Sequence, residues 1–166
     1  MKARLTLLIA LASCLAGCEK QRTPERYLIP SDFEGVVITV FEQEGFPELP
    51  SVDGFRVHRY PEDGVLITSS KQEFGWAADE ILDVLPDGTT RRLSSGNIAD
   101  RRVHFAGTGE TARDGVPTID YRYKAVGTVE FWKDKDAREW SSKADEAAQK
   151  LMRLKKELRQ AKSGLR

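Results

Sequence analysis

The stretch TIDYRYKA, residues 118–125, shows an unbroken alternation of apolar and charged side chains. Successive side chains of a β-strand point to opposite faces of a sheet, so this alternation predicts a strand with two different faces. The apolar face carries Ile119, Tyr121, Tyr123 and Ala125, and the charged face carries Asp120, Arg122 and Lys124. We expect the apolar face to cover a hydrophobic core and the charged face to meet water.

Further short runs on both sides of this strand are rich in β-branched and aromatic residues, which favour strands. They are GVVITVF (35–41), FRVHRY (55–60), VLITSS (65–70), EILDVL (80–85), TTRRL (89–93), RVHFAG (102–107) and GTVEFW (127–132). Asp-Gly pairs, which tolerate the positive φ of tight turns, lie between them, and residues 81–93 read as a hairpin. The pattern predicts a mainly β fold, an antiparallel β-sandwich or small barrel of about seven to eight short strands.

The last part of the chain, residues 133–166, changes to a helical period. Apolar side chains recur there at alternating steps of four and three, at Trp140, Ala144, Ala147, Leu151, Leu154, Leu158 and Ala161. This spacing predicts one long amphipathic α-helix over 137–162, with Asp136 and Glu139 as a capping box. Three arrangements stay open: the helix packs on its own sheet, it meets a protein partner or a second copy through Trp140, Leu151, Leu154 and Leu158, or its basic residues lie against anionic envelope polymers.

The first residues have the order of an export signal. Lys2 and Arg4 precede an apolar run over 5–15, which is shorter than the roughly 20 residues that span a bilayer. LAGC, residues 15–18, resembles the lipobox of bacterial lipoproteins. The resemblance implies that the signal 1–17 is cleaved between Gly17 and Cys18 and that fatty acyl chains such as palmitate anchor Cys18 to a membrane. The alternative is a plain secretory signal with an incidental cysteine.

The lipobox resemblance also implies a location. The protein would lie in the cell envelope, and Glu19 in place of Asp after the cysteine implies the outer membrane, facing the periplasm, in a cell with two membranes. Residues 18–26 then form the lipidated start and a flexible tether, 27–132 the β domain and 133–166 the helix. The whole chain holds 26 basic and 26 acidic side chains, a balance that does not indicate nucleic-acid binding.

The sequence shows no catalytic constellation. His58 and His104 are the only histidines, and each lies in a predicted strand without a second ligand at helical spacing, so we interpret both as strand residues at a surface or core edge rather than metal ligands. GWAADE, residues 75–80, places Asp79 and Glu80 beside Trp76, which fits either a ligand-binding loop or a simple acid at the start of a strand. We predict no catalytic residue, no metal and no cofactor.

Two stretches resemble a known family. YLIPSDFEGVVITVF (27–41) and LPSVDGFRVHRYPEDGVLITSS (49–70) are similar to the opening of a family of bacterial exported proteins and lipoproteins known only as a domain of unknown function. The shared positions are Tyr27 to Pro30, Phe33, Gly35, Pro61, Gly64, Val65, Thr68 and Ser69. The resemblance covers roughly 27–93, implies no activity and transfers no residue role. The C-terminal helix looks like an addition to it.

Three functions remain open on the sequence. The leading one is a lipid-anchored envelope protein that binds a protein partner through its C-terminal helix, or helps to assemble an envelope complex, without catalysis. The second is a binder of small ligands or glycans that uses the sheet face or the candidate residues Trp76, Asp79 and Glu80. The third is an unrecognised envelope hydrolase, for which His58, His104, Asp79 and Glu80 are the residues to test.

Overall fold

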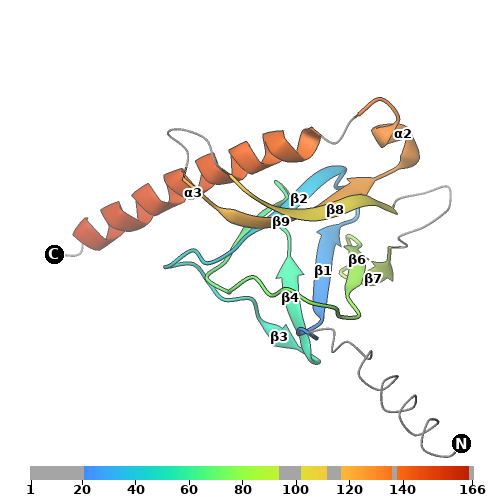
Figure 1. The fold of residues 1–166 in the computed structure, drawn as a ribbon, viewed down its shortest axis with the longest axis horizontal. Helices are drawn as coiled ribbons and strands as arrows, with labels where there is room; N and C mark the ends of the chain where they lie inside the picture. The colour runs from blue at the N-terminus through green and yellow to red at the C-terminus, as the bar shows by residue number, and fades with distance from the viewer. Residues whose placement is uncertain (1–20, 94–101, 112–116, 136–137, 165–166) are drawn as a thin grey trace, which may run out of the picture.

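Two β-sheets face each other, and a long helix covers the outer side of one of them (Figure 1). The computed structural model describes residues 21–93, 102–111, 117–135 and 138–164, and the description below is confined to them. The first sheet has the strand order β3-β4-β1-β6-β7, and the second has the order β5-β2-β9-β8. The layers are therefore sheet, sheet and helix.

The elements of the first sheet are β1 (Glu25–Pro30), β3 (Ser51–Val52), β4 (Phe55–Arg59), β6 (Glu80–Val84) and β7 (Thr90–Arg92). The second sheet consists of β2 (Gly35–Val40), β5 (Val65–Ile67), β8 (Arg102–Glu110) and β9 (Asp120–Gly127). Two helices follow, α2 (Val129–Trp132) and α3 (Glu139–Gly164). The predicted sandwich with one long C-terminal helix is confirmed.

The sheets are mixed, whereas the sequence analysis predicted antiparallel pairing throughout. β1 runs parallel to both of its neighbours, β4 and β6, and β2 runs parallel to β5 and antiparallel to β9. The difference arises because β1, which was not among the predicted strands, enters the middle of its sheet. The predicted hairpin is present as β6 and β7, with Val84 opposite Thr90.

The start of the domain also differs from the prediction. Residues 22–26 were assigned to a tether, but β1 begins at Glu25, whose side chain is fully buried. Pro24 O accepts a hydrogen bond from Arg56 N at 2.9 Å, so even this proline is fastened to β4. The β domain therefore includes at least the residues from Arg22 onward.

The segment 127–132 is a turn and a short helix rather than the predicted strand. The hydroxyl of Thr128 caps α2 by accepting a hydrogen bond from Phe131 N at 3.1 Å. Trp132 is buried at its end and packs with Val36 and Ala125 over the second sheet. Phe131 and Trp132, the aromatic residues that suggested a strand, thus lie on helix α2 and pack against the core from there.

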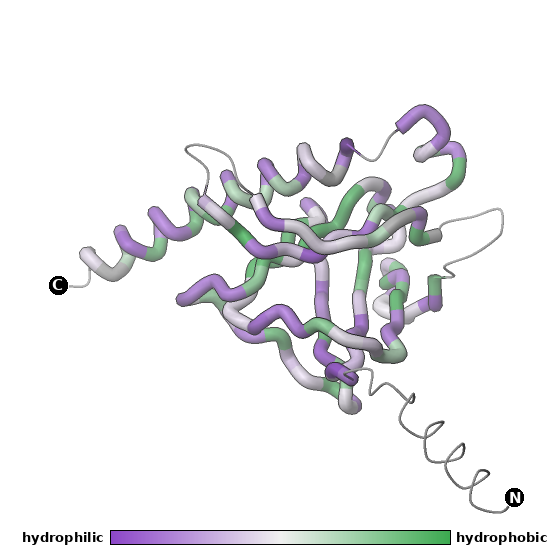
Figure 2. Tube along the Cα trace, in the orientation of Figure 1, coloured by the Kyte–Doolittle hydropathy of each residue, from purple (hydrophilic) through white to green (hydrophobic). Residues whose placement is uncertain are grey.

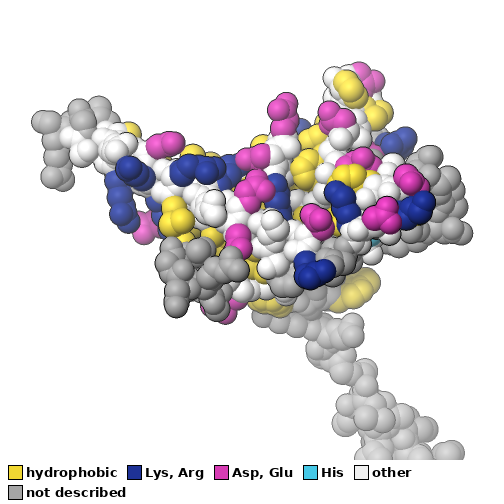
Figure 3. Space-filling view, turned by 90° about the horizontal axis from the view of Figure 1, so that it is seen from above, with side chains coloured by type: hydrophobic (Ala, Val, Ile, Leu, Met, Phe, Trp, Pro, Cys, Tyr) yellow, Lys and Arg dark blue, Asp and Glu magenta, His cyan; other side chains and the backbone are white. Residues whose placement is uncertain are grey.

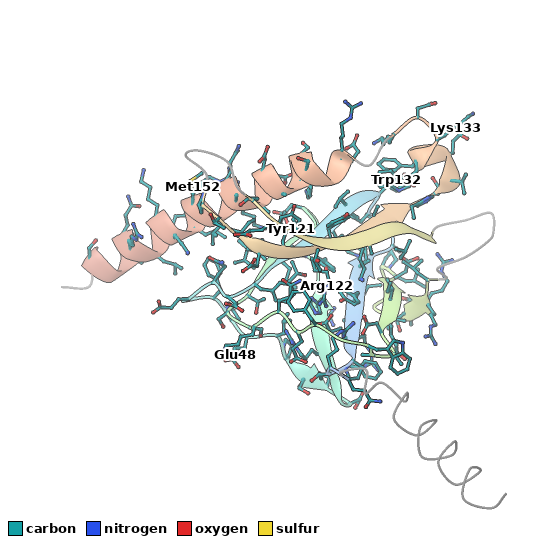
Figure 4. The ribbon with its side chains drawn as sticks, viewed as in Figure 1. Glu48, Tyr121, Arg122, Trp132, Lys133 and Met152 are labelled. Carbon is teal, nitrogen blue, oxygen red and sulfur yellow. The ribbon has the colours of Figure 1, made fainter. Side chains whose placement is uncertain are left out.

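Strand β9 is buried on both faces, because a sheet lies on one side and α3 on the other. Tyr121 packs with the helix residues Ala147 and Leu151, while Arg122 points into the space between the two sheets (Figure 4). Arg122 and Lys124 are only 8% and 7% exposed. The expectation that both meet water is wrong, because the sheet built around β1 covers them.

Helix α3 packs on its own domain, which is one of the three arrangements left open. Its apolar stripe, visible as alternating bands in Figure 2, places Ala144, Ala147, Ala148 and Leu151 in the core. Its last turns extend past the sheets (Figure 1). None of the described helices is long and apolar enough to cross a membrane. Asp136 of the predicted capping box lies outside the described residues.

Gly64 gives a test of this packing. Its φ is +70°, and an added Cβ would lie 2.6 Å from the Phe33 ring. We expect Gly64→Ala to lower the free energy of unfolding by about 2–4 kcal/mol, because backbone strain and a steric clash combine. Urea unfolding measures the loss. Gly54→Ala is the matched control, with φ +80° and no atom within 4 Å of the new Cβ. Equal losses in the two variants would contradict the predicted clash.

Candidate functional site

A group of charged side chains is enclosed between the two sheets, and we call it the ionic cluster. Its members come from both sheets, from the chain entry at Arg22 and from the segment 73–79, which lies between β5 and β6. The cations are Arg22, Arg56, Arg122 and Lys124, and the carboxylates are Glu25, Glu73 and Asp79. Charged groups are rarely buried without partners, so their contacts define what the site can do.

Glu25 on β1 lies at the centre of the ionic cluster and is fully buried. Its Oε2 accepts hydrogen bonds from the Tyr27 hydroxyl and from Arg122 Nη1. Its Oε1 lies 3.5 Å from His58 Nε2. Burial alone would raise the pKa of Glu25, but the adjacent His58, Tyr27 and Arg122 outweigh burial and lower it to about 2. The carboxylate is therefore ionised at neutral pH.

His58 on β4 is also fully buried, which corrects the prediction of a histidine at a surface or core edge. Its ring stacks on Tyr27 with 4.6 Å between centroids, and its Nδ1 lies 3.1 Å from Thr39 Oγ1. Thr39 Oγ1 in turn lies 2.9 Å from the Tyr60 hydroxyl. Burial lowers the pKa of His58. The geometry fits a neutral imidazole whose Nδ1 accepts a hydrogen bond from the Thr39 hydroxyl and whose Nε2–H points toward Glu25.

The remaining carboxylates each have an arginine partner. Arg22 Nη2 contacts Asp79 Oδ2 at 2.6 Å, and Asp79 Oδ1 accepts a hydrogen bond from Glu25 N. Arg56 Nη1 contacts Glu73 Oε1 at 2.7 Å. These contacts fasten the segment 73–79 to the first sheet and to the chain entry at Arg22. All three carboxylates of the ionic cluster are thus matched by the three arginines.

Lys124 is the fourth cation, and no described residue forms a hydrogen bond or ion pair with its ammonium group. Its Nζ lies over the Tyr27 ring, 3.9 Å from the centroid. Burial lowers the pKa of Lys124 to about 8, and attraction by Asp79 offsets burial only in part. At neutral pH most Lys124 side chains are protonated, so the ionic cluster carries one uncompensated positive charge.

A pocket of about 260 Å³ opens over Lys124. It is lined by Arg22, Tyr27, Glu73, Phe74, Gly75, Asp79, Ala106, Gly107, Thr108, Arg122 and Lys124. A buried cation without a partner therefore faces a space that a small molecule can enter.

The predicted loop residues separate in the structure. Asp79 joins the ionic cluster, whereas Glu80 Oε2 accepts a hydrogen bond from Arg26 Nε at 2.7 Å outside it. Trp76 is 62% exposed and lies beside the chain entry at Gln21. His104 Nε2 lies 3.1 Å from the carbonyl oxygen of Gly127. His58 and Asp79 both contact Glu25, through its Oε1 and its backbone N, whereas His104 and Glu80 have other partners. Within the described ranges, no group of metal-ligating side chains is arranged to hold a metal ion.

The predicted helix residues also differ in their surroundings. Leu151 is fully buried in the core, so it is not available to a partner, and Leu154 is partly buried and packs against the core. Leu158 is 39% exposed. The side chain of Trp140 and the lipidation and cleavage residues Gly17 and Cys18 lie outside the described part of the structure, so these calls stay predictions.

Sequence analysis missed the residues that form the centre of the site. Arg122 and Lys124 were recognised as one face of a strand but were assigned to water, and Glu25 was assigned to the tether. A run of charged residues directly before the apolar YLI of β1 was the available signal for Glu25. Nothing local indicated that its partner lies 97 residues further along the chain.

Comparison with known proteins gives a family and a fold. The model of DUF6843, a family of unknown function, matches residues 21–135. A crystal structure of a "putative lipoprotein" from Bacillus anthracis has 23% sequence identity and a TM-score of 0.62, with 80% of this chain and 96% of that chain covered. At this identity the likeness shows a shared fold. No curated protein matches the sequence.

Proposed function

Because the chain belongs to the DUF6843 family, whose function is unknown, we propose a function from the geometry: it is a lipid-anchored cell-envelope protein that binds a small oxyanion without catalysis. The lipobox supports the anchor at Cys18, and the description of the structurally similar protein as a lipoprotein agrees with it. The outer membrane is its location if the cell has two membranes.

One observation carries the binding function: Lys124, 93% buried, faces a pocket and lacks a negatively charged partner among the described residues. Burying an unpaired ammonium is unfavourable, and an anion in the pocket would remove this penalty. The arginines are already occupied by carboxylates, so a ligand with one carboxylate or phosphate group completes the charge balance. At about 260 Å³, the pocket lies just below the usual range of roughly 300–1,000 Å³ for ligand sites, which favours a small ligand.

The proposal predicts a pH-dependent affinity for inorganic phosphate and acetate. The anion binds the protonated amine, so bound anion raises the pKa of Lys124 above its free value of about 8. For acetate, a carboxylate that stays ionised over this range, affinity is then constant from about pH 6 to 8 and falls as pH rises further, approaching tenfold per pH unit. NMR titration of the Lys124 side chain in isotopically labelled protein measures both quantities. Short-chain phosphatidic acid serves as a third probe, and tighter binding of it would assign the anion to a lipid headgroup.

Two variants sharpen this experiment. Lys124→Met removes the charge and should weaken phosphate binding at least tenfold. Lys133→Met, at a side chain that is 65% exposed, is the matched control and should leave the affinity unchanged. If millimolar phosphate, acetate and phosphatidic acid all leave the Lys124 pKa unchanged, the oxyanion function is wrong.

A protein partner at α3 is the second candidate. Figure 3 shows basic side chains gathered along the C-terminal part of this helix, where Arg153, Lys156 and Arg159 are exposed. With Leu151 buried and Leu154 partly buried, the exposed surface there is mainly charged, so it fits an acidic partner or an anionic envelope polymer. In-cell crosslinking of the chain with Lys156→Glu and Arg159→Glu tests this. Removing the whole helix is unsuitable, because it would uncover the core.

A further inference from the structure

We infer that the end of the domain around Phe74 and Trp76 rests on the lipid bilayer that holds Cys18, with these two aromatic side chains in the interfacial layer. The inference rests on the proposed function in one respect, the acyl chains on Cys18. It goes beyond that function by identifying a membrane-contacting surface and therefore an orientation of the domain.

The tether reaches the domain at this end. Gln21, the first described residue, forms an isolated parallel bridge with Trp76, and Arg22 N donates a hydrogen bond to Trp76 O at 3.2 Å. Arg22 Nε donates a second one to the carbonyl oxygen of Gly75 at 3.1 Å. The segment around Trp76 is thus fixed to the point where the chain enters the fold.

The connecting chain is too short to hold this end far from the bilayer. Cys18 precedes Gln21 by three residues. An extended chain spans at most about 3.6 Å per residue, so Gln21 lies within about 11 Å of the lipidated residue. The polar layer on each side of a bilayer is itself about 5–8 Å thick. Acyl chains inserted at Cys18 therefore bring Gln21 and Trp76 to the edge of the headgroups.

Exposed apolar side chains gather at this end. Phe74 and Trp76 are each 62% exposed, and Val52, which is paired with Phe55 across β3 and β4, is 46% exposed. A mostly apolar hollow of about 230 Å³ connects Phe55 with Trp76 and is also lined by Pro24, Ala77 and Ala78. Tryptophan favours the membrane interface because its ring is apolar and its N–H is polar.

The arginines beside this surface are already paired with carboxylates, Arg26 with Glu80 and Arg56 with Glu73, so the contact with the membrane relies on the apolar side chains. Helix α3 lies across the opposite end of the domain from β3 and the chain entry (Figure 1). Helix α3 therefore lies far from the membrane to which the chain is anchored.

This orientation has a consequence for the pocket over Lys124. The pocket is lined in part by Arg22, Phe74 and Gly75. These residues belong to, or lie next to, the proposed membrane-contacting surface around Phe74 and Trp76. Contact of Phe74 with the membrane–water interface brings the opening of the pocket to the lipid headgroup layer. A ligand that diffuses along the membrane surface would then reach Lys124 directly.

Fluorescence quenching by brominated lipids tests the inference. The processed chain is reconstituted into vesicles of three parts phosphatidylcholine to one part phosphatidylglycerol, with part of the lipid brominated near the carbonyl end of its acyl chains. The Trp76 signal is the difference between the native chain and Trp76→Phe. We expect brominated lipid to quench it at least twofold. The matched control carries Met152→Trp on the Trp76→Phe background, because Met152 is 40% exposed on α3, and its added signal should remain unquenched.

Each outcome is informative. Quenching at Trp76 and not at position 152 supports the inference. An unquenched Trp76 in a protein whose acyl chains are confirmed by mass spectrometry overturns it, and so does equal quenching at both positions. If mass spectrometry finds no acyl chain on Cys18, the anchor in the proposed function fails. Cys18 can then be coupled to a maleimide lipid, and quenching at Trp76 and at position 152 still tests whether the surface around Phe74 and Trp76 contacts the membrane.

Discussion

Replacing Glu25 with glutamine is expected to lower the free energy of unfolding by about 3–5 kcal/mol at pH 7, the effect typical of breaking a buried ion pair. The side chain keeps its size but loses its charge, so the positive charge of Arg122 is left without its closest carboxylate between the two sheets. His58 Nε2 and the Tyr27 hydroxyl lose a charged acceptor at the same time. Urea unfolding at pH 7 measures the change.

The stability loss caused by Glu25→Gln is also expected to depend on pH. The pKa of Glu25 is about 2 in the folded chain, against an ordinary value of 4.5, so folding is favoured by the ionised carboxylate. This stabilisation is complete above pH 4.5 and disappears as pH falls toward 2. The difference in stability between the native chain and Glu25→Gln should therefore shrink over that interval.

The matched control is Glu80→Gln. Glu80 also accepts a hydrogen bond from an arginine, Arg26, but both side chains are partly exposed. Water can replace the lost partner there, so we expect a loss below about 1 kcal/mol. A Glu25→Gln variant that is no less stable than Glu80→Gln would show that Glu25 does not organise the core.

Local patterns predicted the parts of this fold that depend on local interactions. The hairpin of β6 and β7 needs only adjacent strands and the turn residues 86–88, and α3 needs only its apolar period. Both are present in the structure. Strand β9 was also identified, because the alternation in 118–125 requires no knowledge of its neighbours. The lipidated start lies outside the described residues and stays a prediction.

The position of β1 depended on interactions that no local pattern shows. Its first residue, Glu25, follows a proline and is charged, which is typical of a solvated tether. It is buried because Arg122, from a strand near the other end of the chain, supplies the opposite charge. Pairing of β1 with β4 and β6 is parallel, and parallel partners are joined by long connections rather than by recognisable turns.

The candidate site was hidden for the same reason. A strand with alternating charge is ordinarily half exposed, so Arg122 and Lys124 were assigned to water. Whether a second sheet covers that face is a property of the whole topology. Asp79 was singled out from the sequence and lies in the ionic cluster, but its neighbour Trp76 faces outward, and Asp79 contacts Arg22 and the backbone of Glu25.

Replacing Lys124 with methionine is expected to stabilise the protein, even though it removes the proposed ligand contact. The pKa of Lys124 is about 8 in the folded chain and 10.5 ordinarily, so the protonated form is disfavoured by folding. The corresponding penalty, on the order of 3 kcal/mol, is present below pH 8. Methionine has a similar length, and its sulfur can contact the Tyr27 ring in place of the ammonium. We expect a gain of about 1–3 kcal/mol at pH 7.

The sign of the pH effect distinguishes this explanation from improved packing. Between pH 8 and 10 the unfolded chain binds more protons at this lysine than the folded chain, so the native protein gains stability as pH rises. The advantage of Lys124→Met should therefore decrease between pH 7 and 9.5. The measurement stops there, because burial raises the pKa values of Tyr27 and Tyr60, which opposes the trend once tyrosines ionise in the unfolded chain, near pH 10.

Lys133→Met is the control for a lysine that is exposed, and its stability should differ from that of the native chain by less than about 0.5 kcal/mol at every pH. A constant gain for Lys124→Met across this pH range would indicate packing alone. A loss of stability would mean that Lys124 already has a favourable partner, and the charge imbalance proposed for the pocket would be wrong. A bound anion would give this buried, destabilising lysine a role beyond folding.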